Sequence, residues 1–298
     1  WIKDINVIDF LRDYGKYFNV NYMLDKDIVR RRLDSGITYA EFSYMILQAL
    51  DYLHLNREFG CTLQVAGQDQ WGNITAGIDL IRKKTGKEVY AFTMPLLTKA
   101  DGTKFGKSEG GAIWLDKDKT TPYEMYQFLI NAEDSKVIDY LKFLTFLSKE
   151  EIEKIEKEQN EHPEMRIAHK ALAREVITFI HGSDAYNEAV RISESLFSGD
   201  IKNLTSKEIE MAFKGLDKIT IKEEMNIVDF LVNTGICSSK RESREFVSNN
   251  SISINGEKVN SLDFVVNSDI AIDKKYVVVR RGKKKYFIIC FGGSDEEE

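Results

Sequence analysis

The sequence is poor in cysteine and histidine, and this scarcity excludes several classes of protein. Its three cysteines, Cys61, Cys237 and Cys290, are odd in number and far apart, and none belongs to a CxxC pair. The sequence therefore predicts neither a disulfide framework nor a cysteine-ligated zinc site, and each thiol is expected to be a small buried hydrophobe. The four histidines show no ligand spacing. We expect no protein-ligated metal, and a reducing cytoplasm as the compartment.

Long apolar runs and a strong overall charge are also absent. No apolar run reaches the roughly 18 residues that a membrane-spanning helix needs, and the amphipathic start has no signal-peptide layout. With 43% hydrophobic and 30% charged residues, the composition is that of a folded globular protein. The formal net charge of −6 argues against a nucleic-acid coat over the whole surface. Residues 227–291, however, carry eleven Lys/Arg against seven Asp/Glu, so a basic module follows an acidic body.

The first third of the chain has the pattern of a parallel α/β fold. Thr38 and Glu41 have the spacing of a capping box at the start of a long helix. The expected elements are a helix over 38–60, a strand over 61–67, a helix over 74–86 and a strand over 89–97. This alternation predicts an α/β class with a parallel sheet, and ligands bind such sheets outside the carboxyl ends of the strands.

The remaining two thirds divide into a helical region and a small mixed module. Periodic segments bounded by Pro, Gly, Asn or Asp predict an all-α domain, and a polar, aperiodic stretch after it reads as a linker. Two helices, an Asn255-Gly256 hairpin turn and two strands around Gly282 then predict an α+β module. The predicted domains are 1–114 (α/β), 115–215 (all-α), 216–226 (linker), 227–291 (α+β) and 292–298 (acidic tail).

Three polar side chains share one face of the first long helix. Tyr44, Gln48 and Asp51 have the spacing i, i+4, i+7, where a helix that only packs would place apolar residues. One interpretation is a solvated helix face, and the other is a polar pocket for a small amphipathic ligand. Gln64, Asp69 and Gln70 follow or end the first strand and would face the same crevice. They favour the pocket.

A glycine-rich loop with lysines follows the second strand. It contains the string K-F-G-K-S with Lys104, Lys107 and Ser108. The loop is interrupted by Gly102, Gly106, Gly110 and Gly111. Glycines let a backbone fold closely around a ligand, and mobile ammonium groups can neutralise charge on a polyphosphate. The alternative is a solvated loop with incidental lysines.

Several strings together resemble the bacterial tyrosyl-tRNA synthetase family. YMILQALD, GQDQWGN, KADGTKFGKSEGGAIWLD and the closing RRGKKKYF occur in the order and spacing of that family, over essentially residues 1–291. KFGKS belongs to the Lys-Met-Ser-Lys-Ser signature of class I aminoacyl-tRNA synthetases. The resemblance implies an incomplete class I nucleotide-binding fold, then a helical domain, then an RNA-binding domain like one in a ribosomal small-subunit protein.

The resemblance also implies roles for the polar residues. Asp51 would accept the hydroxyl proton of the substrate tyrosine, while Tyr44 and Gln48 would hold its ammonium group. Gln70 would lie near the reacting carboxylate, and Asp69 would bind the ribose of ATP. Further implied residues are Gln64 for tyrosine, Gly67 and Leu97 for ATP, and Lys104, Lys107 and Ser108 for the leaving pyrophosphate. The implied partners are ATP with Mg²⁺, tyrosine, tRNA(Tyr) and a second copy of the chain, with no membrane.

The basic module is the expected RNA contact. Its positive residues are Lys240, Arg241 and Arg244 on a helix and Arg280, Arg281, Lys283, Lys284 and Lys285 on the last hairpin. Such a cluster would bind phosphates with little sequence preference. The alternative is a hairpin that only keeps the protein in solution.

The chain also departs from the family pattern. The His-Ile-Gly-His-type signature of the family is found nowhere, and Ala66 and Gln68 stand where relatives usually have Gly and Ser. We therefore expect that the first half of the nucleotide-binding fold is missing and that this chain is inactive by itself. Two other functions stay open: a non-catalytic tRNA-binding fragment, and a different nucleotidyl transferase that reuses the lysine loop.

Overall fold

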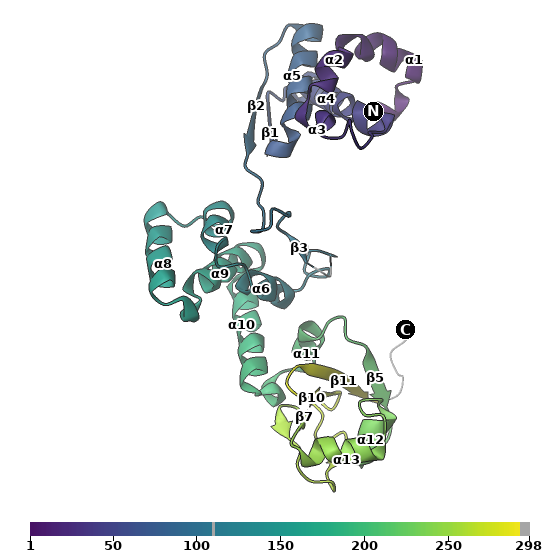
Figure 1. Cartoon of the computed structure of the whole chain (residues 1–298), viewed down its shortest axis with the longest axis vertical. Helices are drawn as coiled ribbons and strands as arrows, with labels where there is room; N and C mark the ends of the chain where they lie inside the picture. The colour runs from purple at the N-terminus through teal and green to yellow at the C-terminus, as the bar shows by residue number, and fades with distance from the viewer. Residues whose placement is uncertain (109–110, 293–298) are drawn as a thin grey trace. The chain divides into compact units, whose positions relative to one another are not determined.

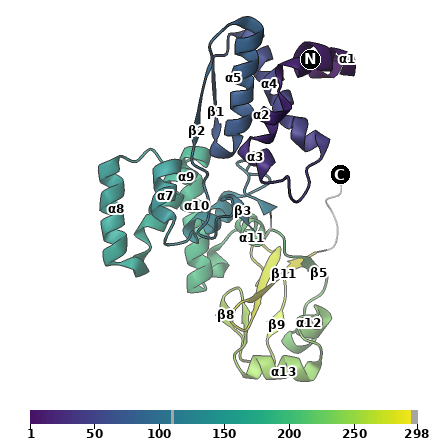
Figure 2. The same ribbon diagram turned by 45° about the horizontal axis from the view of Figure 1, so that its top comes forward.

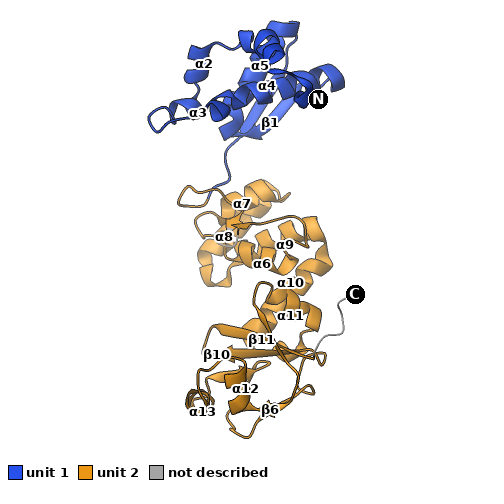
Figure 3. Ribbon diagram, turned by 90° about the vertical axis from the view of Figure 1, so that its right-hand side faces the viewer, with its two compact units in different colours: residues 1–98 blue, residues 99–298 orange. Residues whose placement is uncertain are grey.

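A computed structural model describes residues 1–108 and 111–292 of the chain. The chain forms two compact units, Trp1–Thr98 and Lys99–Glu298, which Figure 3 shows in blue and orange. Each unit is described by itself below. The predicted acidic tail, 292–298, lies outside the described residues except for its first residue.

Unit 1 (Trp1–Thr98) is a small α/β unit. Its elements are η1 (Ile2–Asp4), α1 (Val7–Asp9), η2 (Phe10–Tyr14), η3 (Gly15–Tyr17), α2 (Val20–Leu24), α3 (Asp27–Arg30), α4 (Tyr39–Phe59), β1 (Leu63–Gly67), η4 (Gln68–Gln70), α5 (Trp71–Thr85) and β2 (Tyr90–Met94). Strands β1 and β2 pair in parallel, and α5 connects them. The two strands and the parallel α/β class predicted from the sequence are thus confirmed.

The core of unit 1 lies between α4 and α5. Ala49, Leu50 and Leu53 of α4 and Leu80 and Ile81 of α5 are buried in one cluster. The other face of the two-stranded sheet is open within the unit, since large side chains alternate along it at the surface. These are Leu63, Val65, Tyr90, Phe92 and Met94, which are 42–61% exposed.

Unit 2 (Lys99–Glu298) begins with a short hairpin and a helical domain (Figure 1). The elements are β3 (Lys107–Ser108), β4 (Gly111–Ala112), α6 (Pro122–Ile130), α7 (Val137–Leu144), α8 (Lys149–Glu161), η5 (Pro163–Met165), α9 (Ile167–His181), α10 (Ser183–Ser198), η6 (Ile201–Asn203) and α11 (Ser206–Ala212). Helix α9 contacts α6, α7, α8 and α10 and is the centre of this domain. The predicted all-α region is confirmed.

The rest of unit 2 is a small α+β domain. Its elements are β5 (Lys218–Ile221), β6 (Met225–Asn226), α12 (Ile227–Asn233), α13 (Lys240–Ser248), β7 (Ile252–Ile254), β8 (Glu257–Lys258), β9 (Val265–Val266), β10 (Tyr276–Arg281) and β11 (Lys285–Phe291). The main sheet has the order β5-β11-β10-β7-β8, with β5 parallel to β11. The prediction that 216–226 is only a linker is wrong, because β5 completes this sheet.

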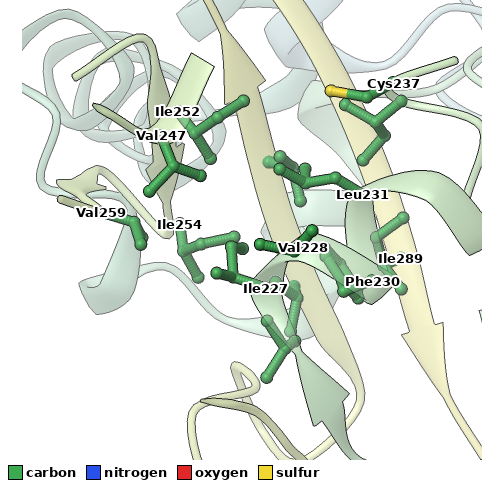
Figure 4. Packing of buried hydrophobic residues seen from close by; sticks show 14 of the residues in the cluster. Ile227, Val228, Phe230, Leu231, Cys237, Val247, Ile252, Ile254, Val259 and Ile289 are labelled. Atoms are coloured by element: carbon green, nitrogen blue, oxygen red, sulfur yellow. The ribbon is translucent and has the colours of Figure 1, made fainter. Parts of the chain in front are cut away.

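The main sheet is packed on both faces. Val277, Val279 and Ile289 point into a cluster with α12 and α13, which Figure 4 shows. Val278 and Ile288 point the other way, into a cluster with residues of α10, η6 and α11. Figures 1 and 2 show α11 on one side of the sheet and α13 on the other. The α+β domain therefore shares a hydrophobic core with the helical domain.

Among the described residues, no helix combines the length and the apolar composition needed to cross a bilayer.

Candidate functional site

The polar face predicted on the long helix is present on α4. The helix begins at a capping box, in which the Glu41 amide donates to Thr38 Oγ1 (3.2 Å) and the Thr38 amide to Glu41 Oε2 (3.0 Å). Tyr44 is 57% exposed, Gln48 is half-buried, and Asp51 is exposed. No ion pair of the described residues involves Asp51. The phenol, amide and carboxylate are thus available to a ligand on one side of α4.

Helix α4 is fixed to the strands through its next residue, Tyr52. The Tyr52 hydroxyl donates to the carbonyl of Tyr90 in β2 (2.7 Å), and burial raises the pKa of this phenol. The ring also lies against α5, since a Cβ at Gly77 would stand 3.0 Å from Tyr52 Cδ1. These contacts fix α4 against α5 and against the start of β2, since Tyr90 is the first residue of that strand.

Gln64, the second residue of β1, adds a polar atom to this region. Its side-chain Oε1 is buried and has no hydrogen-bond donor among the described residues. Because a buried acceptor without a donor is costly, this atom favours a ligand that donates a hydrogen bond.

Asp69 and Gln70 lie where β1 ends and α5 begins. A Cβ at Gly67 would come within 2.9 Å of Asp69 Oδ1 and 3.0 Å of Leu96 Cδ2, so glycine allows these groups to approach the strand end closely. Gln70 Oε1 accepts from Asn73 Nδ2 (3.3 Å), which orients the amide. Leu97 follows β2 and is half-buried. The predicted residues Gly67, Asp69, Gln70 and Leu97 thus lie in the same unit as the polar face of α4, whereas Lys104 and Lys107 belong to unit 2.

The predicted lysine loop forms a short hairpin in unit 2. Strands β3 and β4 pair antiparallel, and the Ile113 amide donates to the Gly106 carbonyl (2.9 Å). Gly102 and Gly106 have φ of +84° and +89°, which L side chains rarely adopt. Lys104 and Lys107 are exposed. The Ser108 side chain and Gly110 lie outside the described residues.

An aromatic contact that the sequence analysis did not foresee holds this loop. The Phe105 ring lies 4.2 Å from the ring of Tyr140 in α7 and 5.0 Å from that of Phe128 in α6. The loop also makes a local turn, in which Thr103 donates to Asp101 and keeps the pKa of that carboxyl below its usual value. The signal available in the sequence was an apolar ring between two lysines. Because the loop and the tyrosine residues belong to different units, their meeting remains a prediction.

The basic residues of the α+β domain form two neighbouring segments. Arg241 and Arg244 are exposed on α13, and Lys283–Lys285 are exposed at the tip of the β10–β11 hairpin. The Gly282 amide of this tip donates to the Ser251 carbonyl (2.8 Å), just after α13, so the segments adjoin. Lys240 pairs with Asp229 (2.6 Å). We call Lys240, Arg241, Arg244 and Lys283–Lys285 the basic face.

The two arginines of β10 are placed differently. Arg281 donates to the Ile236 carbonyl, and its guanidinium lies 5.4 Å from the ring of Phe246 and 5.8 Å from that of Phe287. It therefore contributes to the packing of the domain. Arg280 is half-buried, and its Nε has no hydrogen-bond acceptor among the described residues.

Within the described ranges, no group of three His, Cys, Asp or Glu side chains is arranged to hold a metal ion.

Comparisons with known proteins show the family to which the chain belongs. Residues 1–198 match the family described as "tRNA synthetases class I (W and Y)", and residues 208–289 match "Tyrosine--tRNA ligase SYY-like C-terminal domain". The chain is 54% identical to a tyrosine–tRNA ligase of Staphylococcus haemolyticus and 56% identical to one of Staphylococcus carnosus. Each comparison covers 98% of this chain and 70% of the relative.

A solved structure is similar as well. It is a C-terminally truncated mitochondrial tyrosyl-tRNA synthetase of Aspergillus nidulans, with 36% identity and a TM-score of 0.55. The similarity covers 66% of this chain and 56% of that one. This chain thus spans little more than half the length of that structure.

Proposed function

Because the chain belongs to the tyrosine–tRNA ligase family of class I tRNA synthetases, we propose that its residues serve the ATP-dependent attachment of tyrosine to tRNA(Tyr). The reaction has two steps. A carboxylate oxygen of tyrosine attacks the α-phosphorus of ATP, the bond to pyrophosphate breaks, and tyrosyl-adenylate forms. A hydroxyl of the tRNA then attacks the tyrosyl carbonyl, and AMP leaves with the bonding electron pair.

Unit 1 is proposed to bind tyrosine. The Asp51 carboxylate accepts a hydrogen bond from the phenolic hydroxyl, Tyr44 and Gln48 hold the ammonium group, and Gln64 offers its unpaired acceptor. A carboxylate that binds a hydroxyl distinguishes tyrosine from phenylalanine, because phenylalanine leaves the carboxylate unpaired. Gln70 lies near the reacting carboxylate in this proposal.

The nucleotide is proposed to bind at the carboxyl ends of β1 and β2. Gly67, Asp69 and Leu97 contact ATP there, with Asp69 on the ribose. Lys104, Lys107 and Ser108 neutralise the pyrophosphate as it leaves, and Mg²⁺ arrives with the phosphates of ATP. No covalent enzyme intermediate is needed, so the rate depends on positioning and on stabilisation of charge.

Unit 2 is proposed to bind tRNA through the basic face, assisted by Arg280 and Arg281. Phosphate contacts by exposed lysines and arginines position an RNA without reading its sequence. The working form is proposed to be a homodimer in the cytoplasm.

One observation carries the proposal: the phenol, amide and carboxylate of α4 lie in the same small unit as Gln64 and Asp69. The α4–β2 hydrogen bond from Tyr52 holds these elements together. If the polar face of α4 only contacted solvent, the buried Gln64 acceptor without a donor would have no explanation.

The test is tyrosine-dependent exchange of pyrophosphate into ATP by this chain, compared with its Lys104→Ala/Lys107→Ala variant. Exchange that requires tyrosine and falls at least tenfold in the variant supports the proposal. Exchange with another amino acid, or with no amino acid, contradicts it.

A second candidate, a non-catalytic tRNA-binding fragment, is favoured by the exposure of the basic face. The same preparation separates the two candidates. Binding of tRNA(Tyr) without any exchange would support the fragment, and exchange would exclude it.

A further inference from the structure

The lysine loop is tied to the helical domain by one ring. Phe105 separates Lys104 from Gly106 and Lys107, and it is half-buried although both lysines are exposed. Its ring packs at 4.2 Å on Tyr140, which is 1% exposed, and at 5.0 Å on Phe128. The two rings on which Phe105 packs thus belong to helices α6 and α7 and not to the loop. We call Phe128 and Tyr140 the seat of the Phe105 ring.

A second contact holds the start of the same loop. The Ala100 amide donates to Glu133 Oε2 (2.8 Å), and Glu133 lies between α6 and α7. The hairpin hydrogen bond from Ile113 to Gly106 then closes the loop after the ring. Hydrogen bonds such as that from the Lys99 amide to the Thr103 carbonyl hold the loop to itself, while the Phe105 ring holds it to α6 and α7.

An open pocket of about 640 Å³ lies beside the ring and is lined by Phe105, Phe128, Tyr140 and Trp114, among others. Because Gly106 adds backbone freedom, we expect the contacts of the Phe105 ring to fix the positions of Lys104 and Lys107.

We propose that Phe105 is a positioning residue, which clamps the loop to α6 and α7 and thereby sets the positions of Lys104 and Lys107. The task of these lysines, neutralising pyrophosphate, rests on the proposed function; the clamp itself does not. The contact makes the loop part of the helical domain, so the unit that is proposed to meet tRNA also carries the pyrophosphate lysines.

Hydrogen–deuterium exchange of the peptide spanning 99–114 tests the clamp in this chain. Phe105→Ala should speed amide exchange in this peptide at least tenfold, and Phe105→Leu, which keeps an apolar side chain, should restore most of the protection. The matched control is Phe146→Ala, because Phe146 is 84% exposed and contacts the Phe179 ring edge-on, far along the sequence from the loop. It should leave the peptide unchanged.

Removing the seat should act like removing the ring. Phe128→Ala should also speed exchange in 99–114, and the double variant should add little, because both changes break one contact. Unchanged exchange in Phe105→Ala, or fully additive effects in the double variant, would overturn the clamp.

Ligand binding then separates positioning from a general structural role. Calorimetry should show inorganic pyrophosphate bound at least fivefold more weakly by Phe105→Ala, with L-tyrosine affinity unchanged. Equal weakening of both ligands, or of neither, would contradict the positioning role. If the unmodified chain binds no pyrophosphate, the proposed role of the lysines fails, while the exchange experiment still decides the clamp.

Discussion

The carbonyl oxygen of Gly199 occupies the position that a β-carbon on Gly256 would take, since the two atoms would be only 1.6 Å apart. Gly199 ends α10 in the helical domain, and Gly256 belongs to the β7–β8 turn of the α+β domain. The two domains of unit 2 therefore meet backbone against backbone at this point. The contact adjoins the shared cluster that contains Ile201 and Val278.

We expect Gly256→Ala to destabilise unit 2 strongly. The new methyl group must push the Gly199 backbone away, and φ at residue 256 is +89°, where an L residue costs about 1–2 kcal/mol. Gly282→Ala is the matched control, because Gly282 also has positive φ in a hairpin turn but nothing lies within 4 Å of an added Cβ. Thermal unfolding should show a loss of melting temperature at least twice that of the control. Equal losses would mean that the two domains do not pack as described.

Much of this fold follows from local sequence signals. The capping box at Thr38, the Asn255-Gly256 turn and the β-rich segments each specify their element within a few residues, and all are confirmed. Strand β5 could not be recognised, because its four residues lie in a polar stretch and its partner β11 is more than sixty residues further along the chain.

The candidate site was also predictable only in part, because some of its contacts join residues that are far apart in the sequence. Residue type and helical spacing indicated the polar face of α4. The seat of Phe105, and the packing of Arg281 on Phe246, depend on tertiary contacts that no local pattern encodes. The sequence also predicted a first domain that extends to residue 114, whereas the compact units divide after Thr98. The loop's contacts with α6 and α7 account for that difference.

Asp51→Asn should remove the selectivity for tyrosine. The change keeps the size of the side chain but replaces a charged acceptor, and a hydrogen bond to a charged group contributes about 1.5–3 kcal/mol. Tyrosine affinity, measured by calorimetry, should fall by about 10–100-fold, while phenylalanine affinity should not fall. Glu58→Gln, on the same helix and also exposed, is the control. A variant that still prefers tyrosine as strongly as the unmodified chain would refute the assignment of Asp51.

His169 should make the stability of unit 2 decrease in mild acid. The side chain is fully buried in α9, its Nε2 lies 2.9 Å from the Ala132 carbonyl and 3.0 Å from Asp134 Oδ1, and burial lowers its pKa below 6.5 despite that carboxylate. The unfolded chain binds a proton below pH ~6.5, whereas the folded chain resists protonation. Stability from this residue is therefore complete above pH 6.5 and decreases as the pH falls below it.

Urea unfolding at pH 7.5 and 5.5 measures this effect. The difference in unfolding free energy between the unmodified chain and His169→Gln should shrink at pH 5.5, because glutamine does not titrate. His162→Gln serves as control, since the His162 side chain is 64% exposed. A difference that stays constant between the two pH values would show that His169 does not couple to protons.

The affinity for tRNA and its salt dependence should both increase with the positive charge of the basic face. Lys283, Lys284 and Lys285 are exposed at one hairpin tip, and each phosphate contact releases counterions from the RNA. Changing all three to Gln should therefore weaken tRNA binding at low salt and reduce the slope of log K against log salt by about 2–3. The control changes Lys149, Lys154 and Lys157 of α8 to Gln, which alters the net charge equally at another exposed site. If both triple variants lose the same slope, long-range attraction by net charge explains the binding. A loss confined to the hairpin variant requires direct phosphate contacts at the tip, because equal net charges attract RNA equally at long range.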